Sequence, residues 1–147
     1  MITVSGLLQI KGNAVWTVSS DATILDALRC LKEKDVGALV VVDADQMVGI
    51  ISERDFVRSI AETGNCLIDA PVRNLMTQDV ITVAPDQTIE ACMQLMTAHK
   101  VRHLPVMHED HLVGLISIGD VVKEIISSKE SLIDNLENYI TGRGYGH

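Results

Sequence analysis

The stretch that decides the fold is Val48-Gly49-Ile50-Ile51-Ser52-Glu53-Arg54-Asp55, because it returns 65 positions later (48 against 113) as Val113-Gly114-Leu115-Ile116-Ser117-Ile118-Gly119-Asp120. The same offset carries Asp21-Ala22-Thr23-Ile24 onto Asp86-Gln87-Thr88-Ile89 without a gap. An internal repeat of this kind sets the architecture before any single element is considered. Two similar units packed about a pseudo-two-fold axis form paired clefts, and the repeated Ser and Asp occupy equivalent places in them.

Each repeat is predicted to fold as β-α-β-β-α. Apolar residues at Ile24, Leu28 and Leu31 have the spacing of one face of an amphipathic helix, and the second repeat keeps that pattern from Ile89. Two apolar runs joined by a four-residue polar turn are typical of a hairpin. The fold class is therefore α/β, more narrowly α+β. The predicted strands are 15–18, 38–42 and 47–51 in the first repeat and 80–83, 104–107 and 112–116 in the second, each set followed by a helix from Ser52 or Ser117.

The domain organisation follows from the repeat. A unit of about 60 residues is marginal alone, since a short chain buries too little surface on folding, so the repeats are expected to share a core. Capping residues near Ser127 predict a separate C-terminal helix. The predicted segments are 1–14 (helical lead-in), 15–61 (first repeat), 62–79 (linker), 80–127 (second repeat), 128–141 (C-terminal helix) and 142–147 (flexible tail).

Composition narrows the class of protein. A net charge of −8 at pH 7 argues against a general nucleic-acid binder, which needs a basic face. No uninterrupted apolar run approaches the roughly 20 residues that cross a bilayer. The first residues also lack the pattern of a secretion signal. We therefore expect a cytoplasmic protein with no membrane partner.

Cysteine and histidine spacing predicts no metal site. The three cysteines are odd in number and form no zinc-binding motif. Cys30 and Cys92 lie at helical spacing among apolar residues, which favours small core residues. His108 and His111 lie in a polar turn, which favours exposed loop histidines over metal ligands.

The Ser-x-x-Asp pair at each strand-to-helix junction has two interpretations. The Ser oxygen and the carboxylate are suited to cap the first turn of the helix. A helix N-terminus is equally suited to bind anions and hydroxyls, and a carboxylate there can accept both hydroxyls of a ribose. The two roles are compatible, so the residues leave both open.

These motifs resemble the cystathionine-β-synthase (CBS) domain. The first half carries the resemblance in Gly37-Ala38-Leu39-Val40-Val41-Val42-Asp43 and in the run that ends at Asp55. The second half resembles the family more closely, in Val101-Arg102-His103-Leu104-Pro105-Val106 and in 112–123. The resemblance covers about 1–142, and two tandem copies make it specific. Lys11-Gly12 and the ending at 136–142 are similar to stand-alone CBS-pair proteins, which are adenine-nucleotide-binding modules without a catalytic domain.

The resemblance implies two ligand clefts between the repeats, with ribose hydroxyls on the Asp of one repeat and adenine against the other. The Asp120 cleft would comprise Ser117, Gly119 and Asp120 facing Lys11, Trp16, Val36, Gly37 and Ala38. The Asp55 cleft would comprise Ser52, Arg54 and Asp55 facing Met76, Thr77, Ile81, Val101 and His103. A guanidinium grips phosphate with two nitrogens, and the expected phosphate partners are Arg102, His103, Lys11 and Arg54.

The two repeats are unequal, which predicts clefts that differ in charge and width. Arg102 stands where the first repeat has glycine, and Gly119 stands where it has arginine. Pro105 replaces a valine and cannot donate a ladder hydrogen bond, which fits an edge or bulged strand. The single tryptophan, Trp16, is either a core residue or a stacking surface for adenine.

The function that the resemblance implies is regulation without catalysis. The module would sense adenosine-containing nucleotides (AMP, ADP or ATP) and pass the bound state to a partner protein through a population shift. The alternatives are a sensor of NAD(H) or S-adenosylmethionine, or a ligand-free dimerisation module. An enzyme is disfavoured, because IMP dehydrogenase carries the same repeats but its catalysis resides in a barrel of over about 200 residues. A homodimer is expected, with no catalytic cofactor.

Overall fold

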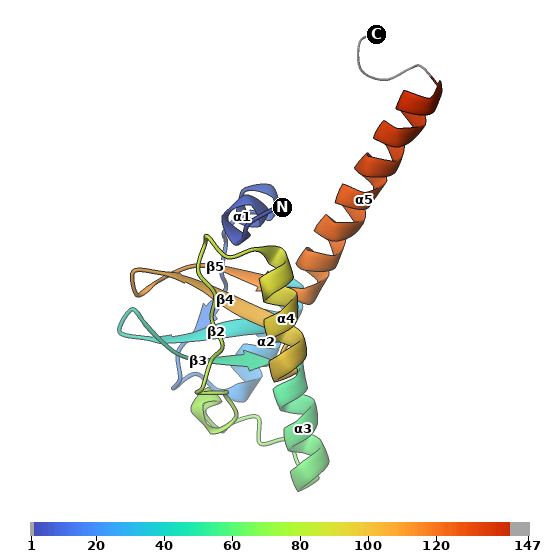
Figure 1. Ribbon diagram of the computed structural model, residues 1–147. Coiled ribbons are helices and arrows are strands. Elements are labelled where there is room, and N and C mark those ends of the chain that lie inside the picture. Colours follow the sequence, from blue (N-terminus) through green and yellow to red (C-terminus); the bar gives the residue numbers. More distant parts are fainter. Residues whose placement is uncertain (1, 142–147) are drawn as a thin grey trace.

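The computed structural model describes residues 2–141, which form two similar halves with helices around two small sheets (Figure 1). The α+β class is confirmed. The predicted flexible tail at 142–147 lies outside the described residues. In chain order the elements are α1 (Val4–Lys11), β1 (Thr17–Val18), α2 (Ile24–Lys34), β2 (Ala38–Asp43), β3 (Gln46–Ser52), α3 (Glu53–Thr63), the 3-10 helix η1 (Val72–Asn74), α4 (Ile89–His99), β4 (His103–His108), β5 (His111–Ser117) and α5 (Ile118–Thr141).

Each half is built on a β-hairpin of the same design. β2 pairs antiparallel with β3 from Ala38 opposite Ser52, and β4 pairs with β5 from His103 opposite Ser117. The predicted four-residue turns are shorter here, because two-residue loops with positive φ at both positions join the strands. Such loops match the twist of the flanking strands. The matched hairpins place Ser52 and Ser117 at equivalent helix starts.

The leading strands of the two halves differ. β1 pairs in parallel with β2, and the amide of Val40 donates to the carbonyl of Trp16 at 3.2 Å. The predicted strand at 80–83 is wrong, because an isolated bridge at Val83 takes its place. Pro105 stands at the position of Val40 and has no N–H, so it cannot make the corresponding bond. β4 is therefore an edge strand, as the missing donor predicts.

The buried side chains form two clusters, one in each half, and not the single shared core that the sequence predicts. Exchanged segments join the halves instead. Val4 and Leu7 of α1, which precedes the first repeat, are buried in the core of the second. Val72 of η1, in the linker before the second repeat, is buried in the core of the first. Each core is completed by a segment from outside its own repeat, so the two repeats depend on each other.

The helices α2 and α4 begin as predicted and bring one helix end to the junction of the halves. The side chains of Thr23 and Thr88 accept amides from the first turns and cap these helices. Lys100 closes α4 in the left-handed conformation, with φ at 55°. Its carbonyl lies within hydrogen-bond distance of Arg54 on α3, so the end of α4 meets the start of α3.

The helix α5 is one continuous helix of 24 residues, and the predicted break near Ser127 is wrong. Ser117 and Asp120 cap its start reciprocally, through amide-to-side-chain bonds of 2.8 and 3.1 Å. No glycine or proline lies between Asp120 and Thr141, so no residue interrupts the helix there. Its second half extends away from the rest of the molecule (Figure 1). In the part of the chain that the structure describes, every helix is too short or too polar to span a bilayer.

Candidate functional site

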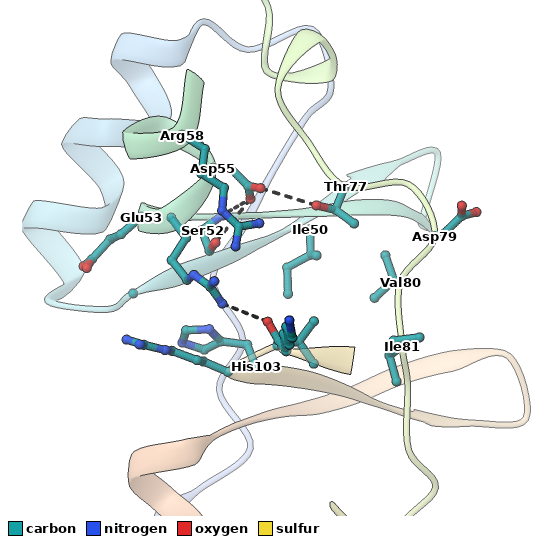
Figure 2. Close-up of a pocket in the computed structure, with 15 residues that line it drawn as sticks. Ile50, Ser52, Glu53, Asp55, Arg58, Thr77, Asp79, Val80, Ile81 and His103 are labelled. Carbon is teal, nitrogen blue, oxygen red and sulfur yellow. Dashed lines mark hydrogen bonds between the residues drawn. The ribbon is translucent and has the colours of Figure 1, made fainter. Parts of the chain in front are cut away.

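A cavity opens where the two halves meet, at the Asp55 cleft (Figure 2). The space between its walls, including the open mouth, is about 800 Å³. β3 and α3 form one side, and β4 with the segments before α4 and before β4 forms the other. The lining residues are Gly37, Ile50, Ser52, Glu53, Arg54, Asp55, Arg58, Thr77, Asp79, Val80, Ile81, Lys100, Val101, Arg102 and His103.

Asp55 is held on the α3 side of this cavity by the start of its helix. Its Oδ2 accepts the amide of Ser52 at 2.8 Å and the Ser52 hydroxyl at 3.2 Å. Its Oδ1 accepts the Thr77 hydroxyl from the facing segment at 3.4 Å, a long and weak bond (Figure 2). Capping therefore occupies one carboxylate oxygen and leaves the second directed across the cleft, where it can accept a ligand hydroxyl.

Four cationic side chains line the cavity, against three carboxylates, so the lining carries one net positive charge (four minus three). Arg54 and Arg58 come from α3, and Lys100 and Arg102 come from the segment between α4 and β4. The Nη1 of Arg54 donates to the carbonyl of Lys100 at 2.8 Å. Carbonyls at the C-terminus of a helix have no partner within the helix and carry partial negative charge. Arg54 thus joins the repeats across a cleft that can also receive an anion.

His103 lies at the start of β4, against the first repeat. Its Nε2 is 3.3 Å from where a Cβ on Gly37 would lie, so a side chain at position 37 would press on the imidazole. Burial lowers the pKa of His103 below its usual 6.5; Asp120 and Glu53 oppose this effect, and nearby cations add to it. The imidazole is therefore neutral at pH 7, with one nitrogen as donor and one as acceptor.

The Asp120 cleft repeats the capping arrangement but has a different third partner. The Nζ of Lys11 lies 2.6 Å from Asp120 Oδ2 and donates to the Leu115 carbonyl at 2.7 Å. Burial alone would raise the pKa of Asp120, but the hydrogen bonds from Lys11 and Ser117 together hold it below its usual 3.8. This carboxylate is ionised at pH 7 and already matched by an ammonium group.

Most of the residues implied for the Asp55 cleft come together in the cavity. Met76 is the exception: its Sδ lies 2.8 Å from where a Cβ on Gly49 would be, so it packs on β3. Gly37, implied for the other cleft, lines this one. The predicted residues found in the cavity are Ser52, Arg54, Asp55, Thr77, Ile81, Val101, Arg102 and His103.

Only some of the residues implied for the Asp120 cleft come together there. Trp16 is 42% exposed, with Lys34 Nζ 4.4 Å from its ring centroid, so the interpretation as a core residue is wrong. Ala38 is buried, and Val36 packs against the first core. The cluster that forms at this cleft consists of Lys11, Ser117 and Asp120, with Gly119 exposed beside it.

Six lining residues were not predicted: Ile50, Glu53, Arg58, Asp79, Val80 and Lys100. Arg58 follows Arg54 by one helical turn, and this i, i+4 spacing is a signal that could have identified it. Lys100 carries no such signal, because its place depends on where α4 ends relative to α3.

The cysteines and histidines were expected to be core or surface residues, and the described part of the chain places them as follows. Cys92 is buried in the second core as predicted, and burial raises the pKa of its thiol. Cys30 is partly buried against the first core. His108 and His111 are exposed. Within residues 2–141, no three His, Cys, Asp or Glu side chains lie together as a metal site would require.

Comparison with known proteins relates this geometry to one family. The family model of the CBS domain matches residues 10–62 and 72–127. The chain is 35% identical to the mitochondrial CBS domain-containing protein CBSX3 of Arabidopsis thaliana over 153 residues, which cover 97% of this chain and 73% of that protein.

Solved structures agree with the family match. The crystal structure of the CBS-domain containing protein ATU1752 from Agrobacterium tumefaciens has a TM-score of 0.81 at 39% identity, covering 84% of this chain and 98% of that one. The CBS domain pair of protein MJ0100, in complex with 5′-methylthioadenosine and S-adenosyl-L-methionine, has a TM-score of 0.75 at 21% identity and covers 88% and 98%. With its two hairpin-to-helix repeats, this chain belongs to the CBS-domain family as a tandem pair.

Proposed function

We propose that this CBS pair is a regulatory module that binds an adenosine-containing nucleotide, AMP, ADP or ATP, in the Asp55 cleft. The observation that carries the proposal is the placement of Asp55. One carboxylate oxygen caps α3, and the other points across a cavity whose lining includes four cations. Ribose hydroxyls suit the second oxygen, and phosphate oxygens suit the arginines.

The remaining lining offers an apolar surface for the base. Ile50, Val80, Ile81 and Val101 all line the cavity, and Val80 and Ile81 lie side by side on the facing segment (Figure 2). Ligand sites commonly combine such an apolar surface with a few polar groups that set orientation. Adenine against these side chains would leave its ribose near Asp55 and its phosphates near α3.

The charge of the cleft favours a phosphorylated ligand over S-adenosylmethionine. S-adenosylmethionine carries a positive sulfonium, which gains nothing from Arg54, Arg58 and Arg102. The complex of MJ0100 with two adenosyl compounds supports the adenosyl class of ligand, and the cations of this chain support phosphate. NAD(H) also carries phosphates, and direct titration separates it from the mononucleotides.

Regulation without catalysis is the role that follows. The two matched repeats occupy 10–62 and 72–127. A ligand in this cleft touches α3 of one repeat and the segment before β4 of the other, so it favours one relative arrangement of the repeats. A partner protein that distinguishes the arrangements would then respond to nucleotide.

We include a homodimer in the proposal, formed through α3 and α5. Val57 on α3 and Val122 on α5 are equivalent in the repeat (57 against 122) and are 66% and 41% exposed. Along α5, Ile126, Ile133 and Ile140 recur every seven residues and are also exposed. That spacing is typical of a seam between two helices. A second copy offers the same surface, so one two-fold contact covers both.

The test is a titration of the purified protein with AMP, ADP, ATP, NADH and S-adenosylmethionine, followed by thermal unfolding and calorimetry. A ligand that binds only the folded state adds about 2.7 kcal/mol of stability at a hundredfold excess over Kd. We expect this gain from the mononucleotides, and we expect Asp55→Ala to remove it. If no adenosyl compound shifts the melting temperature at millimolar concentration, the proposal fails in favour of a ligand-free dimerisation module.

A further inference from the structure

The N-terminal helix α1 ends at the Asp120 cleft, and the second repeat holds it there. The Ser5 amide donates to the Pro85 carbonyl at 2.8 Å. The methyl groups of Leu8 lie 2.8 Å from where a Cβ on Gly114 would be, so α1 approaches β5 as closely as glycine allows. Lys11 is the last residue of this anchored helix. Its side chain therefore reaches the cleft from a rigid support.

Lys11 takes the place that a backbone segment takes in the other cleft. There, the carbonyl of Ile50 accepts the amide of Thr77 at 2.8 Å. The equivalent carbonyl here is that of Leu115 (50 against 115), and it accepts the Lys11 ammonium at 2.7 Å. The same ammonium lies 2.6 Å from Asp120 Oδ2. One side chain thus contacts both the carbonyl of this cleft and one oxygen of its carboxylate, Oδ2.

The ion pair makes Asp120 a poorer acceptor for a ligand than Asp55. The side chains of Lys11 and Asp120 are only 29% and 24% exposed, so water screens the pair less than it screens a surface pair. The ammonium and the capping amide of Ser117 both contact Oδ2, so a ribose in this cleft would have to bind Oδ1 of a carboxylate whose charge Lys11 already neutralises. At Asp55 a ribose displaces only a weak hydroxyl contact of 3.4 Å.

We infer that Lys11 is an internal occupant of the Asp120 cleft, so that the chain binds one nucleotide, in the Asp55 cleft. The identity of the ligand in this inference rests on the proposed function, whereas the ion pair between Lys11 and Asp120 is independent of it. Helix α1 sets the number of ligands, because the second cleft becomes available when Lys11 leaves Asp120. The two clefts of the repeat then have different roles, one for ligand and one for an internal lysine.

Isothermal titration calorimetry of the full chain with ADP tests the inference. The wild-type chain is expected to bind one ADP, and Asp55→Ala to weaken that binding at least about tenfold. Lys11→Met introduces the residue found at the equivalent position 76. It is expected to bind two ADP. The affinity of its Asp120 cleft should be at least about tenfold higher than that of the same cleft in the wild type. The double variant Lys11→Met/Asp120→Ala should lose that second event, and Lys32→Met, an exposed lysine on α2, is the matched control.

Each outcome decides one of the two ideas. Two ADP bound by the wild type, or one ADP bound by both the wild type and Lys11→Met, overturns the inference. If the wild type binds none and Lys11→Met binds one at Asp120, the inference holds and the assignment to Asp55 fails. If neither protein binds ADP, both the inference and the assignment to Asp55 fail.

Carbon-detected NMR of the Asp120 carboxyl gives a readout without ligand. The pKa of Asp120 should rise in Lys11→Met, and an unchanged pKa means that the ion pair between Lys11 and Asp120 does not form. Lys11→Gln serves if the Met variant does not fold.

Discussion

The guanidinium of Arg54 on α3 donates a 2.8 Å hydrogen bond to the carbonyl of Lys100, the residue that closes α4, and so joins the two repeats. The second cleft cannot repeat this contact, because Gly119 stands at the equivalent position. The bond crosses the cavity in which we propose that nucleotide binds. Binding and the relative arrangement of the repeats are therefore coupled, because a phosphate competes with this carbonyl for the guanidinium.

Replacement of this arginine should affect stability and binding together. Arg54→Ala removes a charged hydrogen bond between the repeats, and we expect a loss of about 1 kcal/mol in the free energy of unfolding. We also expect weaker ADP binding. Arg58→Ala, one turn along α3, should weaken ADP binding without the same loss of stability. Urea unfolding and calorimetry of both variants check this, and equal loss of stability in both would contradict a linking role specific to Arg54.

Replacing each of the two repeated aspartates should distinguish its role in helix capping from a role in ligand binding. Asp55→Ala and Asp120→Ala each lose a helix cap, which costs about 1 kcal/mol. Only Asp55→Ala should also weaken ADP binding, by about 1–3 kcal/mol, since it removes a charged partner of the ribose. Thermal unfolding measures the first effect and calorimetry the second. Equal loss of affinity in both variants would mean that both carboxylates serve one ligand.

The single tryptophan should report on the Asp120 cleft alone. Trp16 is equivalent to Ile81 (16 against 81), and Ile81 lines the Asp55 cleft. ADP should therefore leave the fluorescence of the wild type unchanged and quench it in Lys11→Met, where a base can stack on the exposed indole. Such stacking contributes about 1–3 kcal/mol per base. Quenching of the wild type at concentrations that saturate Asp55 would place the bound base beside Trp16 instead.

His103 should make the stability of the fold depend on pH. Burial lowers the pKa of its imidazole in the folded state below 6.5, so the unfolded chain binds the proton more readily. The contribution of this histidine is fully present above about pH 6.5 and is lost as pH falls through the folded-state pKa. Urea unfolding from about pH 7 to pH 5 measures the slope. His103→Gln should reduce it, and the exposed His111→Gln should not; an equal slope in His103→Gln would exclude this histidine as the cause.

The proposed dimer face on α5 can be tested by charge. Ile126 is 51% exposed on the seven-residue stripe. Ile126→Lys brings like charges together across a two-fold contact and should raise the dimer dissociation constant at least about tenfold, measured by sedimentation velocity. Ser127→Lys, one residue further on the helix, is the matched control. If the wild type sediments as a monomer at all concentrations, no such dimer exists.

Much of the fold could be predicted because its signals are local. Apolar spacing located α2 and α4, threonines located their starts, and Pro105 predicted an edge strand through its missing N–H. Two predictions were wrong because the elements they describe also depend on residues elsewhere in the chain. The serines at 127 and 128 can cap a helix, but α5 was already capped at Ser117 and did not end there. The strand at 80–83 had the right residues but lacked the donor opposite it.

The candidate site likewise has one part that the sequence predicts and another that depends on tertiary contacts. The sequence alone determined that two Ser-x-x-Asp junctions exist at equivalent places, because each depends on residues three apart. Only the tertiary structure decided how the clefts differ, because contacts between residues far apart in the chain depend on packing. Lys11 reaches Asp120 across 109 positions, and Arg54 reaches Lys100 across 46. Both contacts require that α1 and α4 be docked through their buried side chains, and no short-range sequence pattern carries that information.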